Sequence, residues 1–256
     1  MTDRLTIRTM QRDELDTAIV WAEKEGWNPG IHDADSFYAA DPHGFFIGEI
    51  DGEPIGCISV VNYDDRFAFG GFYIVKPEYR ARGYGKQIYA HGFFHAKDRN
   101  IRFEGTGGGR VPEGLVPLED IPVDRIVAYD TAHFPVPRER FIRSWITQEG
   151  SSGWGAFDRD GKLAGFGVIR PCFVGYKIGP LFADTPEIAE AIYHGLMARA
   201  TGEQVYFDTP EPNAAAVDIA LKHGMVKVFE TGRMYTKSVP DLPIHEIFGI
   251  TSFELG

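Results

Sequence analysis

The sequence predicts an α/β protein in which two copies of the same order of helices and strands are arranged around a mixed sheet. Strand-forming runs at 45–61 and 154–170 each centre on an Asp-Gly pair, Asp51-Gly52 and Asp160-Gly161. Such a pair is typical of a β-hairpin with a type I′ turn. A helical pattern precedes each hairpin, and a further strand and helix follow it. Alternation of this kind predicts helices packed on a mixed sheet.

In the first copy the elements follow in a regular order. The opening helix has one apolar face, and after the hairpin comes a strand at 67–75, then a glycine-bearing loop and a second helix. The apolar face consists of Leu15, Ala18, Ile19 and Ala22. Only about 20 residues separate that loop from the glycine run 105–109, which leaves room for one helix and a strand at 101–105. We therefore expect the first copy to lack a strand–helix pair.

The second copy has the complete series. Its opening helix is marked by Phe141, Ile142, Trp145 and Ile146, and after the hairpin a strand, a helix, a strand, a helix and a strand are predicted. These occupy, in order, 172–182, 186–200, 204–210, 211–224 and 226–236. Pro186 suits the start of the second of these elements and Gly224 the end of the fourth. Phe248, Ile250 and the terminal "TSFELG" predict a last strand.

The same reading divides the chain into an N-terminal domain (1–108), a linker (109–120) and a C-terminal domain (121–256). The glycine run 105–109 begins the connection between them. It has a second reading as a phosphate-binding loop, but no helix starts directly after it to supply the dipole that such a loop needs.

Composition narrows the class of protein. The chain has 256 residues, 43% of them hydrophobic and 25% charged, as in a soluble globular protein. Cys57 and Cys172 lie in apolar, strand-like contexts, which predicts two buried thiols in a reducing compartment. The charged N-terminus does not resemble a signal peptide, and no apolar run approaches the ~18 residues of a membrane span. We expect a cytoplasmic protein without a membrane partner.

The net charge of −11 also bears on partners. A surface this acidic repels a phosphate backbone, so nucleic acid is not an expected partner. The charge either favours the approach of a cationic small molecule, such as an amine, or serves solubility alone.

The most informative segment is "KPEYRARGYGKQIY" (76–89), which follows the strand at 67–75. Arg80, Arg82 and Lys86 carry positive charge, while Gly83 and Gly85 give the backbone freedom to approach a ligand closely. A strand, a glycine turn and a helix N-terminus together make an anion site. The spacing fits neither a P-loop nor a dinucleotide-binding fingerprint. The alternative is a solvated basic turn.

Arg80-x-x-Gly83-x-Gly85, preceded by "YIVKPEYR", resembles the acyl-CoA pyrophosphate loop of the GNAT superfamily of N-acyltransferases, and the resemblance covers most of residues 4–104. It implies that the strand before the loop pairs with the pantetheine arm. The implied pantetheine contacts are Ile74 and Val75. The implied pyrophosphate contacts are Arg80, Arg82, Gly83, Tyr84, Gly85 and Lys86.

The second copy is similar to the same superfamily, in particular to a two-copy, YitH-like subgroup. The resemblance rests on "RPCFVGYKIGPLFAD", on "FDTPEPNAAAVDIALKHGM", with Asn213 at the start of a helix, and on "VFETGRMYT". Its equivalent of the loop is "ADTPEIAEA", which has neither the glycine pair nor the arginine. The tyrosine that family members often use as an acid is replaced by Ala220. The second copy is thus expected to keep the fold but not a cofactor site.

The resemblance implies an acetyl-CoA-dependent N-acetyltransferase acting on a primary amine of a small molecule or peptide by direct attack on the thioester. Backbone N–H groups near Phe72–Ile74 are expected to polarise the thioester. The candidate catalytic side chains are Tyr73, Glu104 and Asp208. Each has a structural alternative: a packed aromatic for Tyr73, a solvated strand residue for Glu104 and a helix cap for Asp208.

Other functions stay open at this point. Because no side-chain acid or base stands in the usual places, a non-catalytic acyl-CoA-binding sensor is the main alternative, and a structural protein with a vestigial loop is another. His91 and His95, four residues apart, form a possible metal pair, but no third ligand has matching spacing. No metal is expected.

Overall fold

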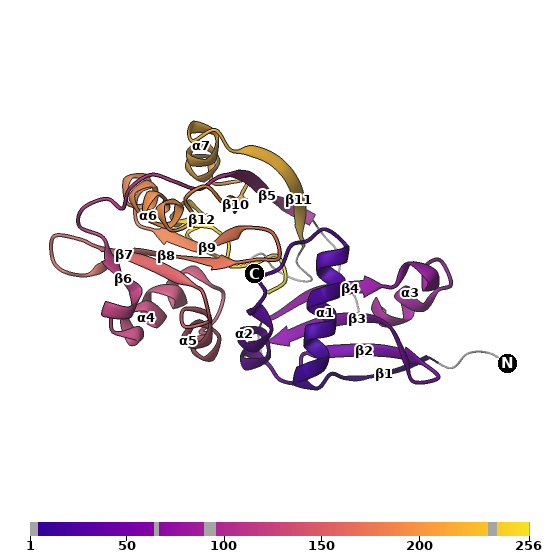
Figure 1. Cartoon of the computed structure of the whole chain (residues 1–256). Coiled ribbons are helices and arrows are strands. Elements are labelled where there is room, and N and C mark those ends of the chain that lie inside the picture. Colours follow the sequence, from indigo (N-terminus) through magenta and orange to yellow (C-terminus); the bar gives the residue numbers. More distant parts are fainter. Residues whose placement is uncertain (1–4, 64–66, 90–95, 235–239, 256) are drawn as a thin grey trace.

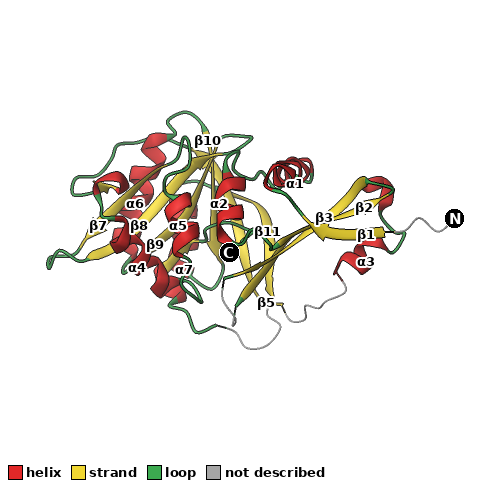
Figure 2. Ribbon diagram, turned by 90° about the horizontal axis from the view of Figure 1, so that it is seen from below, coloured by secondary structure: helices red, strands yellow, loops and turns green. Residues whose placement is uncertain are grey.

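A computed structural model describes residues 5–63, 67–89, 96–234 and 240–255. The chain forms two sheets, one in each half of the molecule, and its last residues lie between them (Figure 1). The first half is the smaller of the two. Figure 2, seen from below, shows the long strand β5 (Ala96–Thr106) beside β11 (Val226–Met234).

The first sheet is antiparallel, with four strands in the order β1-β2-β3-β4. The strands are β1 (Leu5–Thr9), β2 (Phe45–Ile50), β3 (Glu53–Asn62) and β4 (Ala68–Val75). Between β1 and β2 the chain forms α1 (Arg12–Lys24) and α2 (Asp33–Ala40). As the apolar pattern predicts, Leu15, Ala18, Ile19 and Ala22 are buried on one face of α1. After β4 come a short 3₁₀ turn, the glycine loop and α3 (Tyr84–Tyr89).

The second sheet is mixed and has the order β11-β5-β10-β9-β8-β7-β6, with β12 beside β9. Its strands are β5 (Ala96–Thr106), β6 (Val116–Pro117), β7 (Ser152–Phe157), β8 (Leu163–Pro171), β9 (Tyr176–Ala183), β10 (Gln204–Pro210), β11 (Val226–Met234) and β12 (Ile247–Gly249). The helices α6 (Pro186–Arg199) and α7 (Ala214–Lys222) cover one face, and α4 (Val123–His133) and α5 (Glu139–Trp145) lie on the other (Figure 1).

The two Asp-Gly turns differ from each other. Asp51 and Gly52 have φ values of 52° and 81°, so the first hairpin has the expected type I′ geometry. In the second hairpin only Gly161 has positive φ, and Asp158 and Lys162 close a longer loop through a 2.9 Å backbone hydrogen bond. The expectation of a type I′ turn at Asp160-Gly161 is wrong, because the chain there needs one left-handed residue rather than two.

The strand β5 connects the two halves. It was expected at 101–105 as part of the first copy, but it runs from Ala96 to Thr106 and lies between β10 and β11 of the second sheet. Phe103 pairs with both Phe207 and Lys227. The first sheet therefore ends at β4 within the described residues. The predicted linker likewise contributes β6 to the second sheet. Strand pairing thus joins the halves across the boundaries that the sequence suggests.

The halves also share a core. Phe37 of α2 stacks on Trp145 of α5, with ring centroids 6.0 Å apart, and meets Phe72 of β4 edge-on at 5.6 Å. All three side chains are fully buried or nearly so. Because these contacts are apolar and continuous from one half to the other, they remove substantial apolar surface from water and hold the halves together.

The C-terminal segment (247–255) lies at the junction. The expected final strand exists but is shorter and earlier than predicted: β12 covers only Ile247–Gly249, and a turn follows it. Beyond the strand, Tyr63 donates its hydroxyl hydrogen to the carbonyl of Leu255 at 3.0 Å. One short segment thus contacts the sheets of both halves.

Candidate functional site: a bulged strand and a glycine loop

The strand β4 contains a bulge where the reaction centre was expected. Cys57 of β3 pairs with Ile74 and Ser59 pairs with Gly71, so two residues of β4, Phe72 and Tyr73, lie opposite one residue of β3. Phe72 has a φ of 45°, an unfavourable value for a bulky side chain. Bulges and strained backbone re-aim backbone groups and gather at functional sites. Within the described residues β4 is also the last strand of its sheet, so one edge is open to a ligand.

The loop after β4 turns sharply over this open edge. Ala81 and Gly83 have φ values of 60° and 83°. At Gly83 an added Cβ would meet no atom within 4 Å, so the glycine is required by the backbone angle and the space above it is open. At Gly85 an added Cβ would lie 2.4 Å from the Tyr73 hydroxyl oxygen, so that side chain would have to shift to make room. The loop therefore leaves free space at Gly83 and packs tightly at Gly85.

The turn also carries backbone N–H groups for which the described residues give no acceptor. The Arg80 N–H donates to the carbonyl of Pro77 at 3.2 Å, and the next N–H with an acceptor among the described residues is that of Gln87, which donates to the carbonyl of Gly83 at 3.3 Å. Unpaired N–H groups at the start of a helix attract anions. Arg82 and Lys86 are exposed beside them, and the Arg82 guanidinium lies 5.7 Å from the Tyr79 ring centre. The predicted loop residues therefore offer both donors and positive charge.

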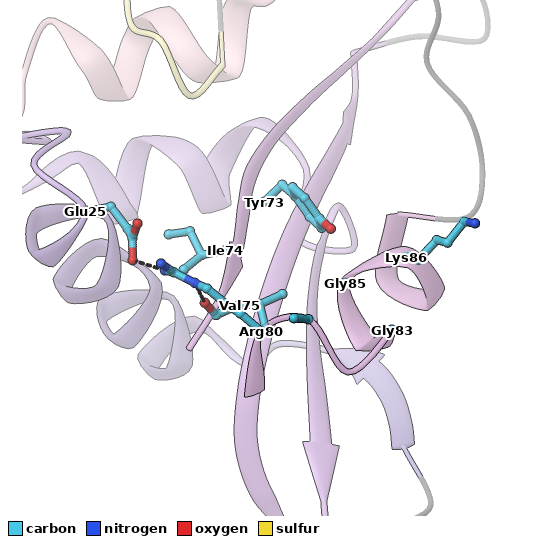
Figure 3. A pocket seen from close by; sticks show the side chains of 9 residues that line it. Glu25, Tyr73, Ile74, Val75, Arg80, Gly83, Gly85 and Lys86 are labelled. Carbon is cyan, nitrogen blue, oxygen red and sulfur yellow. Dashed lines mark hydrogen bonds and ion pairs between the residues drawn. The ribbon is translucent and has the colours of Figure 1, made fainter. Parts of the chain in front are cut away.

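Arg80 has a different position from that expected of a free phosphate ligand. Its Nε donates to the carbonyl of Val75 at 2.7 Å, and its Nη2 is paired with the carboxylate of Glu25 at the end of α1. Figure 3 shows Arg80 reaching toward α1 while Tyr73 reaches toward α3. Arg80 thus fixes the shape of the loop by joining the end of β4 to α1. A ligand would have to compete with Glu25 for its charge.

These elements line a cavity of about 410 Å³ that is open to solvent on one side. Its lining includes most of the predicted cofactor residues, namely Ile74, Val75, Arg80, Gly83, Gly85 and Lys86, together with Glu25, Tyr73 and Ala81. Ile74 and Val75 have buried side chains, so a ligand at the strand edge would meet their backbone, where the Val75 carbonyl already accepts from Arg80 Nε. The cavity thus combines an open strand edge, a basic loop and a phenol, a set that suits an extended ligand with an anionic end.

The three candidate catalytic residues are not together. Tyr73 lines the cavity and is 40% exposed. Glu104 is on β5 in the second sheet, opposite Tyr206, and burial together with the Glu104 charge raises the pKa of that tyrosine. Asp208 is completely buried on β10. Only Tyr73 lies at the cavity formed by β4 and the loop.

Asp208 is occupied by an ion pair. Arg102 donates to both carboxylate oxygens, Nε to Oδ1 and Nη2 to Oδ2, each at 2.7 Å. Burial alone would raise the pKa of Asp208, but the arginine outweighs it and the pKa is lowered. The helix-cap alternative does not hold either, because Asn213 caps α7 by accepting the N–H of Ala216. The geometry gives Asp208 a structural role in joining β5 to β10.

In the second half the strands β9 and β10 pair along only part of their length, and β12 lies beside β9. β9 and β10 pair at only three positions, from Val205 with Tyr176 to Phe207 with Ile178, and then diverge. β12 enters the gap, pairing Ile247 with Phe182, and the N–H of Ile250 donates to the carbonyl of Asp208 at 2.9 Å. The missing loop was visible in the sequence, but this occupation of the gap was not.

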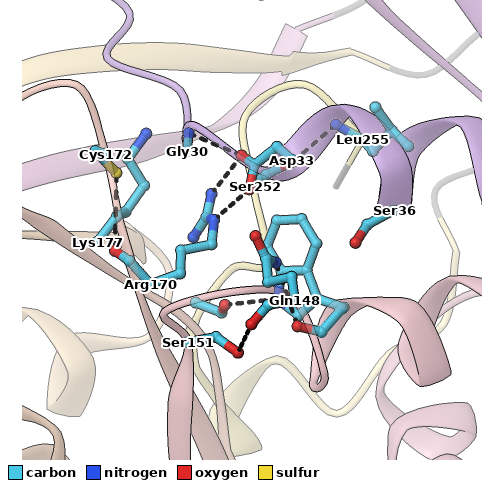
Figure 4. A network of polar contacts seen from close by, with 12 residues as sticks. Gly30, Asp33, Ser36, Gln148, Ser151, Arg170, Cys172, Lys177, Ser252 and Leu255 are labelled. Atoms are coloured by element: carbon cyan, nitrogen blue, oxygen red, sulfur yellow. Dashed lines mark hydrogen bonds and ion pairs between the residues drawn. The ribbon is translucent and has the colours of Figure 1, made fainter. Parts of the chain in front are cut away.

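Sequence reasoning also missed a buried polar cluster at the junction of the halves (Figure 4). Arg170 of β8 pairs with Asp33 of α2, and Lys177 of β9 donates to the carbonyl of Asn28 at 2.7 Å. Glu254 is also buried, and neither of its carboxylate oxygens has a partner among the described residues. The hint in the sequence was the set of charged residues inside apolar strands, which cannot be paired without knowing the fold.

Comparison with known families agrees with this architecture. A family model described as "Acetyltransferase (GNAT) family" matches residues 9–104, and one described as "Acetyltransferase (GNAT) domain" matches residues 126–249. The chain belongs to the GNAT family. Both halves carry its fold, in tandem, as the sequence predicted. The narrower YitH-like subgroup stays a prediction.

Individual relatives show how far this tandem GNAT chain resembles known proteins. "Holothin acyltransferase" of Pseudoalteromonas sp. (strain SANK 73390) is 29% identical over 263 residues, covering 92% of this chain and 89% of that protein. A putative acetyltransferase from Pyrococcus horikoshii superimposes with a TM-score of 0.81 at 20% identity, covering 100% and 97% of the two chains. The N-myristoyltransferase of Saccharomyces cerevisiae gives a TM-score of 0.65 at 10% identity, covering 100% and 86%. The two structures show the shared fold.

Three further expectations concern a membrane span, a metal pair and the cysteines. No helix among the described residues is both long enough and apolar enough to cross a membrane. The histidines His91 and His95, considered as a metal pair, lie outside the described residues. Cys57 and Cys172 are both buried and unpaired with each other, as predicted.

Proposed function

We propose that this GNAT protein is an acetyl-CoA-dependent N-acetyltransferase and that its first half alone holds the donor. The observation that carries the proposal is the bulged, open edge of β4 next to a loop with free space at Gly83. An extended thiol ester with a pyrophosphate end fits such a cavity, with Ile74 and Val75 along the strand edge and residues 80–86 around the phosphates. The second half supports this division, because β12 fills its equivalent gap.

The chemistry needs three events. The ammonium of the acceptor loses a proton, its nitrogen lone pair attacks the thioester carbon, and the C–S bond breaks to release a thiolate that takes up a proton. The carbonyl oxygen becomes negative on the way, and N–H groups at the Phe72 bulge are proposed to stabilise it. Tyr73, whose hydroxyl lies near Gly85, is proposed as the acid for the thiolate. Glu104 is retained as a weaker candidate for the base.

The acceptor is proposed to be a primary amine on a small molecule or a peptide. The acidic chain favours a cationic partner. A relative named for holothin makes holothin itself a suitable first compound to test. We further propose that the reaction takes place in the cytoplasm, since both cysteines are present as free thiols.

The donor site can be tested with two matched glycine variants. Gly83 and Gly26 have similar φ values, 83° and 78°, and in each case an added Cβ would meet no atom within 4 Å. Gly83→Ala and Gly26→Ala should therefore cost similar stability, roughly 1 kcal/mol. Only Gly83→Ala should weaken the thermal protection given by acetyl-CoA. Equal protection of both variants would contradict the proposed donor site.

Transfer is tested by following CoA release with acetyl-CoA, first with holothin and then with a panel of amines that includes a polyamine and a peptide with a free N-terminus. The proposal expects turnover with at least one amine, and Tyr73→Phe should slow it without loss of acetyl-CoA protection. Protection by acetyl-CoA without turnover on any amine would instead favour the non-catalytic sensor.

A further inference from the structure

The helices α6 and α7 bring three metal-binding side chains together on the outer face of the second sheet, away from the cavity at β4. Glu190 and His194 are four residues apart on α6 and so lie on one face of that helix. His223 is the C-cap residue that follows α7. One ligand atom from each of the three lies within 4.8 Å of the others.

The geometry centres on one carboxylate oxygen. Glu190 Oε1 is 2.7 Å from His223 Nε2 and 4.0 Å from His194 Nε2. These separations are close to those of ligands around one small cation, because metal–ligand bonds of about 2.0–2.2 Å place neighbouring donors about 3–3.5 Å apart in a tetrahedron. Adjustments of less than about an ångström in side chains would bring all three atoms to the same ion.

The rings are held in place by their neighbours. Tyr193 stacks on His223 with ring centroids 5.1 Å apart, and His194 meets the same ring edge-on at 4.6 Å. Tyr193 is itself buried against Phe207 in the core. The exposed fractions of the Glu190, His194 and His223 side chains are 26%, 40% and 23%. An ion could therefore reach the three residues from solvent without opening the core.

Lys222 balances the negative charge of Glu190 when no metal is bound. Its ammonium contacts both oxygens of Glu190, Oε1 at 2.7 Å and Oε2 at 3.0 Å. Lys222 is 64% exposed, so it can leave Oε1 at little cost. It can also remain on Oε2, and a hydrogen bond of that kind to the second oxygen orients a ligating carboxylate.

From this geometry we propose that Glu190, His194 and His223 bind a divalent transition metal ion such as Zn²⁺, which fastens α6 to α7. Two imidazoles and one carboxylate suit Zn²⁺, and water would complete a tetrahedron. The site lies on the half that lacks the cofactor loop, so it is independent of the proposed acyl transfer. The alternative is a metal-free contact in which Glu190 simply joins Lys222 and His223.

The experiment uses the full chain without a histidine tag, treated with a chelator and then titrated with Zn²⁺ by calorimetry and with Co²⁺ by visible absorption. We expect one metal ion per chain, a rise in melting temperature with Zn²⁺, and reversal by chelator. His223→Ala and His194→Ala should each weaken binding by about tenfold or more.

Lys222→Gln is the matched control, because it removes a 2.7 Å contact to Glu190 but no metal ligand. It should bind Zn²⁺ at least as tightly as the unchanged protein. The proposal is overturned if the unchanged protein binds no Zn²⁺ or if binding survives both histidine substitutions. It is also overturned if Lys222→Gln loses binding as His223→Ala does, since the substitutions would then act through the helix contact alone.

Discussion

Arg170 of β8 and Asp33 of α2 form a completely buried ion pair across the junction of the two halves. The Nε–Oδ1 distance is 2.7 Å and the Nη2–Oδ2 distance is 3.1 Å, and neither side chain is exposed to solvent. Asp33 also accepts the N–H of Gly30 at 2.9 Å. The pair therefore fixes the segment between α1 and α2 against the second half (Figure 4).

Breaking this pair should cost much more stability than breaking an exposed one. Asp33→Asn leaves a buried guanidinium without its counter-charge, for which we expect a loss of about 3–5 kcal/mol in the free energy of unfolding. Asp35 on the same helix is 73% exposed and pairs with Arg12, so Asp35→Asn should cost less than about 1 kcal/mol. Urea unfolding measures both. Similar losses would show that the buried pair contributes little.

Gly71 of β4 should be intolerant of any side chain. A Cβ at this position would lie 2.2 Å from the backbone carbonyl oxygen of Glu254, which cannot move without displacing the C-terminal segment. We expect Gly71→Ala to destabilise the protein by about 1–3 kcal/mol and to expose the segment to carboxypeptidase digestion. Ala68→Ser, at the exposed start of the same strand, is the control. Unchanged digestion of Gly71→Ala would argue against the close approach.

Glu254 should stabilise the cluster through its charge. The carboxylate is close enough to Arg102, Arg170 and Lys177 for its charge to interact with each of theirs. Glu254→Gln would leave the buried cluster with an excess positive charge, and we expect a loss of about 1–3 kcal/mol. Glu203→Gln, at an exposed position, should have almost no effect. Equal melting temperatures for the two variants would refute this role.

Acid should remove the contribution of Glu14 in a defined pH range. Arg8 donates to both of its oxygens, at 2.7 and 2.6 Å, and these hydrogen bonds lower the pKa of Glu14 to about 2. Because the folded-state pKa lies below the unfolded value of about 4.3, the stabilisation is complete above pH 5 and disappears as the pH falls toward 2. The stability difference between the unchanged protein and Glu14→Gln should narrow over that range. Asp13 is exposed in the same turn, so the stability difference between the unchanged protein and Asp13→Asn should stay small over the whole pH range.

Both thiols should resist modification while the protein is folded. Burial raises the pKa of Cys57 to about 12 and raises the pKa of Cys172 as well, so neither is a thiolate at pH 8. We expect almost no reaction with an aromatic disulfide reagent in the native state and two thiols per chain in urea. Rapid reaction of one thiol in the folded protein would mean that its strand opens locally. If the thiols of the folded protein do not react, the same reagent can also be used to follow CoA release.

The sequence by itself determined the local features. The apolar face of α1, the type I′ turn at Asp51-Gly52 and the glycine loop all depend on residues close together in the chain, whose spacing specifies their conformation. For the same reason the glycine loop could be located in the sequence. The sequence also showed that the second half has no such loop.

Only the tertiary structure decided which distant segments meet. The residues of β5 do not indicate that it pairs with β10 and β11, because the side-chain pattern of a strand does not specify which strands it pairs with. The same holds for Asp33 with Arg170, for Asp208 with Arg102, and for β12 in the gap between β9 and β10. The partners of the buried charges, and the strand that lies beside β9, come from residues far away in the sequence. Their roles therefore become visible only when the chain is folded.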